Sequence, residues 1–212
     1  MIHHKLKRAL KFRKIEFVGA TYGLGNSSSF NLPSGLQEND IVIVASYSDD
    51  FTVGLPTGYT AGQSGRPWST GYRWAWKRMG STPDTQVSGV TGNSSTLYGH
   101  IAMVFRNVNK TTTLDVSSPT VTDSDTGMPN CPSITTSNNN AMIVIIGYLD
   151  DDAVASSVTA PSTYELAITH QGGFTLMGAY KFKEIAGTDN PAAFGGTGSD
   201  DWIGCTIALK SQ

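Results

Sequence analysis

Two short apolar runs in the chain predict strands that are buried on both faces. The run at 41–46 carries no charged side chain, and the run at 142–146 has the same character. A central strand of a covered sheet has such a continuous apolar pattern, whereas a half-exposed strand alternates. We therefore expect both runs to lie at the centre of the fold.

A third segment alternates and predicts a strand with two unlike faces. Tyr72, Trp74 and Trp76 point to one side of the strand over 72–79, and Arg73 and Lys77 point to the other. The aromatic side is expected in the core, because large rings dominate burial. Further strands are expected at 15–22, 28–32, 98–105 and 202–209. The segments between are rich in Gly, Pro, Asn, Ser and Thr, which favour turns, and the body shows no helical periodicity.

The chain repeats itself. Asn39 and Asn140 begin similar strings at an offset of 101 residues (140 − 39). Internal repetition indicates two similar structural units. The repeat is carried by four pairs of segments: 39–50 with 140–151, 56–59 with 161–164, 75–77 with 179–181, and the closing strands 100–105 with 204–209.

These patterns predict an all-β fold, an antiparallel β-sandwich that is jelly-roll-like with about eight strands. We interpret 15–212 as a single domain with an internal duplication over about 39–105 and 140–209. The segment 107–139 is interpreted as a connection within that domain. The sequence leaves open whether the two halves form opposing sheets or interleave.

Charge divides the chain unequally. Residues 1–14 hold six basic residues and no acidic one, which leaves 9 Lys and Arg against 17 Asp and Glu in the remainder, a charge of −8. We treat 1–14 as a basic N-terminal arm, either a solvated chain end or a partner-docking segment. Its candidate docking residues are Lys5, Lys7, Arg8, Lys11, Arg13 and Lys14. The body has no matching basic patch, so no specific nucleic acid is expected, and no apolar run is long enough for a membrane span.

Two groups of residues are candidates for ligand binding. Trp68 lies in a turn-like segment and is a candidate for stacking on a sugar, although single exposed aromatic residues are common. A carboxylate cluster follows each central apolar run and could hold calcium, although adjacent aspartates seldom supply enough ligands. The candidate metal ligands are Asp49, Asp50, Asp150, Asp151 and Asp152.

The sequence offers no recognisable catalytic constellation. No Gly-x-Ser-x-Gly nucleophile turn occurs, and no histidine has a partner at a metal-ligand spacing. Cys131 and Cys205 leave open two free thiols or one bridge. We therefore expect no enzyme and no cofactor.

Several segments resemble small β-sandwich proteins of the virions of tailed bacteriophages. The resemblance spans about residues 15–210, and Tyr59 stands where a tryptophan is expected. It implies a capsid-decorating (cement) or tail- or fibre-associated protein located in the virion, with other virion proteins as partners. It also implies a homo-oligomer, for which virion symmetry favours a trimer. The segments that carry it are 17–21, 32–37, 40–46, 56–60, 76–77, 104–108 and 207–210.

The alternative function is a carbohydrate-binding module that recognises host-surface glycans. A hydrolase on a sandwich scaffold is ranked last, because no acid, base or nucleophile can be identified.

Overall fold

The structure, a computed structural model, is an all-β sandwich with antiparallel pairing throughout. It describes residues 13–24, 27–48, 53–65, 71–90, 98–116, 120–124, 126–150, 157–196 and 198–212. Within these ranges no helix is long and apolar enough to cross a membrane. The strands are β1 (Glu16–Leu24), β2 (Ser29–Asn31), β3 (Ile41–Ser48), β4 (Thr60–Gly65), β5 (Gly71–Arg78), β6 (Gln86–Ser88), β7 (Tyr98–Arg106), β8 (Thr120–Ser124), β9 (Ile134–Thr136), β10 (Ala141–Leu149), β11 (Glu165–Gln171), β12 (Thr175–Lys183), β13 (Gly187–Asp189) and β14 (Trp202–Leu209).

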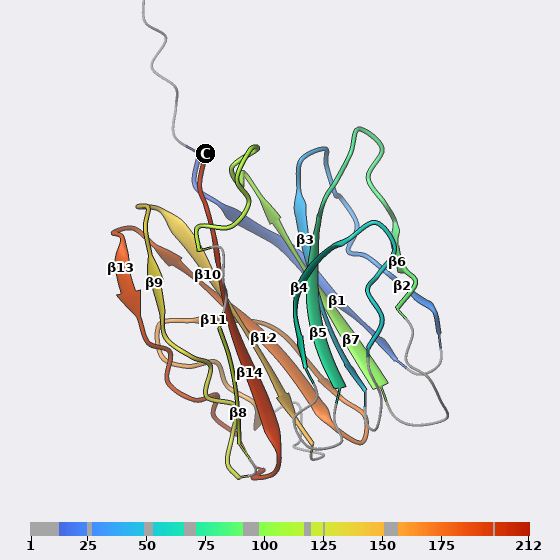
Figure 1. Cartoon of the computed structure of the whole chain (residues 1–212), viewed down its shortest axis with the longest axis vertical. Coiled ribbons are helices and arrows are strands. Elements are labelled where there is room, and N and C mark those ends of the chain that lie inside the picture. Colours follow the sequence, from blue (N-terminus) through green and yellow to red (C-terminus); the bar gives the residue numbers. More distant parts are fainter. Residues whose placement is uncertain are drawn as a thin grey trace, which may run out of the picture.

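Each half of the chain makes its own five-stranded sheet. The first sheet has the order β1-β7-β3-β5-β4, and the second has the order β11-β12-β10-β14-β8. The halves therefore pack as opposing sheets, blue to green against yellow to red (Figure 1). The all-β sandwich prediction is confirmed, but the finer expectation of a jelly roll with about eight strands differs from this topology. A jelly roll passes repeatedly between its sheets, whereas this chain changes from one main sheet to the other between β7 and β8.

The two halves have the same connectivity. Strands β8 to β14 follow the same path as β1 to β7, with β2·β6 and β9·β13 as separate two-stranded ribbons. The register also corresponds: Ser46 pairs with His100, and their counterparts Gly147 and Gly204 pair with each other. The resemblance at the level of sequence is thus matched strand by strand in the fold.

The ribbons explain why the central strands are buried on both faces. One apolar core fills the space between the sheets. A second lies between the first sheet and the β2·β6 ribbon, and a third lies under the equivalent cover of the second sheet. Every residue of β3, β10 and β14 is buried in this four-layer stack, as the continuous apolar runs predict.

Matched asparagines start the two central strands. Asn39 and Asn140 have φ values of 71° and 63°, a left-handed conformation that asparagine tolerates better than most residues. Their backbone N–H groups donate to the carbonyls of Met79 and Glu184, 2.9 Å away in both cases. The chain thereby turns sharply into β3 and β10 in the same way.

The strand directions give the body two distinct ends. Glu16 pairs with Arg106, and Met142 pairs with Leu209, so the start of β1 and the end of β14 lie at one end, which we call the terminal end. The opposite end carries Leu24, Ser48 and Leu149, the last residues of β1, β3 and β10, and we call it the distal end. Figure 1 shows the C-terminus beside the start of β1 at the terminal end.

Candidate functional site

The two described residues of the predicted docking segment lie at the terminal end. Arg13 and Lys14 are exposed, whereas Ile15 is buried in the central core. The Lys14 ammonium lies 4.1 Å from the centroid of the Phe182 ring, and Asn107 Nδ2 donates to the Lys14 carbonyl over 3.1 Å. The other predicted docking residues, Lys5, Lys7, Arg8 and Lys11, lie outside the described residues.

The strand ends that flank the loop candidates lie at the distal end. Trp68, Asp49, Asp50, Asp151 and Asp152 lie outside the described residues, between strand ends that are described there. Their roles stay predictions.

Asp150 is the one described member of the acidic set. The Tyr148 hydroxyl donates to Asp150 Oδ1 over 2.7 Å, and the Asp150 N–H donates to the Asp201 carbonyl. The described part of the chain contains no group of three or more His, Cys, Asp or Glu side chains that could hold a metal. In the structure, this carboxylate accepts the hydrogen bond of a buried tyrosine hydroxyl.

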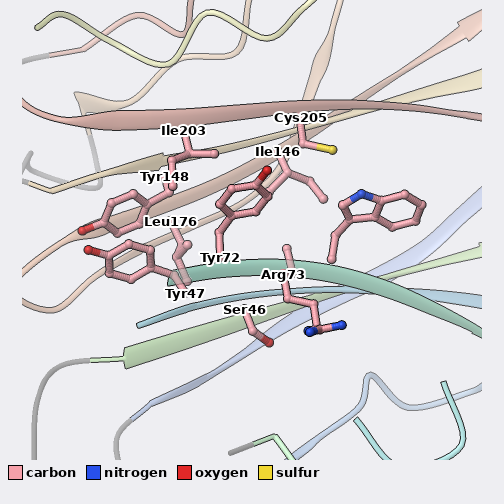
Figure 2. Close-up of a pocket in the computed structure, with 11 residues that line it drawn as sticks. Ser46, Tyr47, Tyr72, Arg73, Ile146, Tyr148, Leu176, Ile203 and Cys205 are labelled. Atoms are coloured by element: carbon pink, nitrogen blue, oxygen red, sulfur yellow. The ribbon is translucent and has the colours of Figure 1, made fainter. Parts of the chain in front are cut away.

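A cavity of about 30 Å³ lies between the two sheets. It is lined mainly by aromatic and aliphatic side chains of β3, β5, β10 and β14, as Figure 2 shows. Tyr47 and Tyr148, which are repeat counterparts, stack across it with an interplanar angle of 17°. Ser46 and Arg73 border it but turn their side chains away (Figure 2). Such a volume accommodates about one or two waters, so the cavity does not enclose a substrate.

Polar side chains are organised on the outer face of each sheet, at matched positions. In the second half, Lys181 Nζ lies 2.6 Å from Asp189 Oδ2, and the Tyr164 hydroxyl donates to Asp189 Oδ1 over 2.6 Å. In the first half, Lys77 Nζ lies 2.5 Å from Asp84 Oδ2. Each lysine also lies over the ring of the matched tyrosine, Tyr59 or Tyr164. Each set joins the sheet to the loop and ribbon that cover it.

The two sets differ in how completely they are paired. Burial alone would raise the pKa of Asp189, but hydrogen bonds from Lys181 and Tyr164, with the charges of Lys181 and Lys183, lower it overall. The Tyr59 hydroxyl is buried and has no hydrogen-bond partner among the described residues. Burial and the nearby charge of Asp84 raise the pKa of Tyr59. The Asp189 carboxyl is therefore held ionised and the Tyr59 hydroxyl is held protonated, so both groups serve packing better than proton transfer.

One polar pair is present in the first half only. His100 and Ser46 face each other on β7 and β3, at 2% and 4% exposure, and His100 stacks on Phe30 of the covering ribbon. Burial lowers the pKa of His100 to about 4. Their counterparts in the second half are Gly204 and Gly147. A neutral, enclosed histidine of this kind is suited to packing and not to exchange with solvent.

The cysteines are free and buried, which resolves the alternative left open by the sequence. Cys131 lies in the outer core of the second sheet and Cys205 in the central core, on opposite faces of that sheet. Burial raises the pKa of the Cys131 thiol to about 12 and that of Cys205 well above its usual value. Because the thiolate is the nucleophilic form, neither sulfur is an activated nucleophile.

One exposed aromatic surface was not predicted from the sequence. Tyr22 of β1 is 52% exposed and stacks on His170 of β11, with ring centroids 4.0 Å apart. Leu24, two residues further along β1, is 43% exposed. The sequence signal is weak, because Tyr22 and Leu24 resemble any alternating strand residues and His170 lies 148 residues away (170 − 22).

Comparison of the chain with family models, curated proteins and solved structures finds no match in any of the three.

Proposed function

We propose that this chain is a non-enzymatic structural protein of a bacteriophage particle, either capsid-decorating or tail- or fibre-associated, that docks through its basic segment 1–14. The observation that carries the proposal is that the body has two different ends. The basic segment joins the body at the terminal end, where the described C-terminus also lies. The loops that follow β3 and β10 leave from the opposite end.

The charge distribution supports docking by the segment. Six basic residues precede a remainder of charge −8, so the segment differs in sign from the body it leaves. A cationic segment is attracted to an acidic partner surface, and this attraction weakens with salt. The partner is expected to be another virion protein with an acidic docking surface.

The build of the body supports a structural role. Apolar cores separate four layers, and the described polar clusters hold covering loops and ribbons to the sheets. This arrangement supplies a rigid, layered body. A rigid module with one docking end and one free end suits the surface of a particle.

Truncation and charge removal test the docking. Deleting residues 1–12 retains Lys14 and its contacts, so the chain should fold with an unchanged melting temperature. We expect the truncated chain to be lost from purified virions of the phage that encodes it, as measured by mass spectrometry. A matched full-length variant with Lys5, Lys7, Arg8 and Lys11 changed to glutamine separates the charge of the segment from its length.

Two results would overturn the proposal. Full incorporation of the truncated chain would remove the docking role of the segment. Absence of the wild-type chain from purified virions would remove the particle assignment altogether.

Light scattering on the full-length and truncated proteins tests the homo-oligomer, for which a trimer is our first expectation. The same closed oligomer in both would mean that faces of the sandwich hold the assembly. Conversion to monomers on truncation would mean that the segment itself holds the copies together, and virion docking would lose its main support.

Carbohydrate binding is the second candidate function. Its sequence-based candidate, Trp68, lies outside the described residues. The observation that favours it is the half-exposed Tyr22 ring, held in place by His170 near the distal end.

A further inference from the structure

A flat apolar surface lies where the edge strands of the two sheets meet, toward the distal end. Strands β1 and β11 lie beside each other there. Tyr22 and Leu24 are two positions apart on β1 and therefore project from the same face of that strand. The Tyr22 ring rests on the His170 ring with an interplanar angle of 24°. We call Tyr22, Leu24 and His170 the aromatic platform.

The platform is held in place before any ligand arrives. Tyr22 belongs to the first sheet and His170 to the second, so the stacked pair joins two rigid elements. Tyr22 nevertheless leaves about half of its surface, 52%, open to solvent. A ring that is already fixed loses little conformational entropy on binding, which favours affinity.

Its surroundings are polar but uncharged. The neighbouring described segments 21–24 and 169–174 contain no Asp, Glu, Lys or Arg. Burial lowers the pKa of His170, so its ring is neutral near pH 7. The turn at Gly172 packs closely against the platform, because a Cβ at this position would lie 3.3 Å from His170 Nε2 and 3.7 Å from Leu24 Cδ2.

We infer that the aromatic platform binds a neutral sugar ring of an oligosaccharide. The apolar C–H face of a hexose matches a flat exposed ring, and its hydroxyl groups match uncharged polar neighbours. A charged ligand would find no counter-charge within the described segments 21–24 and 169–174. A stable protein partner needs roughly 800 Å² on each side, far more than these side chains present. This inference specifies the site of the second candidate function and does not depend on the virion proposal.

The test is an NMR titration of the full-length, ¹⁵N-labelled chain with neutral hexaoses of glucose, mannose and N-acetylglucosamine at millimolar concentrations. We expect at least one of these probes to shift the resonances of Tyr22, Leu24 and His170. Tyr22→Ala should weaken that binding about tenfold, which corresponds to about 1.4 kcal/mol and is what the loss of one aromatic stacking contact can cost. Tyr22→Phe should bind within about threefold of wild type, since it keeps the ring.

Ile185→Ala is the matched control, because Ile185 is an exposed apolar residue (74%) next to the terminal end. It should leave binding unchanged. If Tyr22→Ala does not fold, Leu24→Ala takes its place with the same expected direction. The inference is overturned if no neutral probe shifts the platform, if binding survives both substitutions, or if sialylated probes alone bind. None of these results bears on incorporation into virions.

Discussion

Replacing Asp189 with asparagine tests how strongly a buried ion pair holds the outer ribbon of the second half. The Asp189 side chain is 5% exposed and accepts hydrogen bonds from Lys181 and Tyr164. The first half provides its own control, because Asp84 pairs with Lys77 at the matched position but is 35% exposed. The two substitutions remove the same charge beside matched lysines, but Asp189 is more buried and also accepts a hydrogen bond from Tyr164.

The magnitude follows from that difference. Removing one partner of a fully buried pair costs about 3–5 kcal/mol, because the other charge is left uncompensated. Lys181 is 26% exposed and regains part of its hydration, so we expect Asp189→Asn to cost about 2–3 kcal/mol. For Asp84→Asn, where both partners contact water, the expected loss is about 0.2–1 kcal/mol.

Urea unfolding at pH 7 measures both losses. With a slope of about 2 kcal/mol per molar urea, Asp189→Asn should lower the urea midpoint by about 1 M more than Asp84→Asn does. The folded-state pKa of Asp189 is lowered, so its contribution is present above the ordinary carboxyl pKa and is lost as pH falls through the folded-state value. The gap between wild type and Asp189→Asn should therefore close in strong acid. Equal losses for the two aspartates at pH 7 would refute the role given to burial.

Three further predictions concern single side chains. Burial lowers the pKa of His100 to about 4. The free energy of unfolding should therefore be at its full value above about pH 6.5 and fall by at most about 3 kcal/mol as the pH drops toward 4. His100→Gln should flatten this decline, as measured by urea titrations at stepped pH. Gly62→Ala should cost about 1–3 kcal/mol by thermal unfolding, because the new Cβ would meet a buried indole ring, whereas Gly80→Ala, with open space around it, should change stability little. Tyr164→Phe should lower the free energy of unfolding by about 1 kcal/mol, because it removes a hydrogen bond to a buried carboxylate. Tyr59→Phe should be neutral or stabilising, because the Tyr59 hydroxyl has no partner among the described residues. A larger loss for Tyr59→Phe than for Tyr164→Phe would contradict the pairing described for the two tyrosines.

The sequence was most informative where burial leaves a strong pattern. The strand over 202–209 is observed with the predicted bounds, and the apolar run at 41–46 forms most of β3. Trp74 lies in the central core at 2% exposure, as its alternation with Arg73 predicts. These positions can be predicted from the sequence because one or both faces of the strand exclude water.

Edge strands and ribbons are harder to predict from the sequence, because their positions depend on partners far away in the chain. Strand β4, Thr60–Gly65, is mostly exposed and has no apolar alternation. Its glycine at 62 is needed because the Trp74 ring lies against it, a requirement that appears only when β5 is placed alongside. The ribbon strand β13, Gly187–Asp189, is three residues long and carries no periodicity that a sequence reading could detect.

The polar sets of the outer faces were partly visible in the sequence. Tyr59 and Lys77 lie inside the repeated segments, and so do their counterparts Tyr164 and Lys181. Their aspartate partners lie in segments whose sequences do not match otherwise. The spacing from tyrosine to aspartate is nevertheless the same in both halves, 25 residues (84 − 59 and 189 − 164), and this recurrence is the signal that the sequence carries.

The glycine pair of the second sheet matches that sheet to its own cover and to no other. A Cβ at Gly147 would lie 2.8 Å from Pro129, and one at Gly204 would lie 3.1 Å from the Cα of Cys131. The first sheet has Ser46 and His100 at those positions, under a phenylalanine ring. A recombination that placed the cover of one half over the sheet of the other would therefore produce either overlap or a hole. Each cover therefore fits only its own sheet, although the two halves share one connectivity.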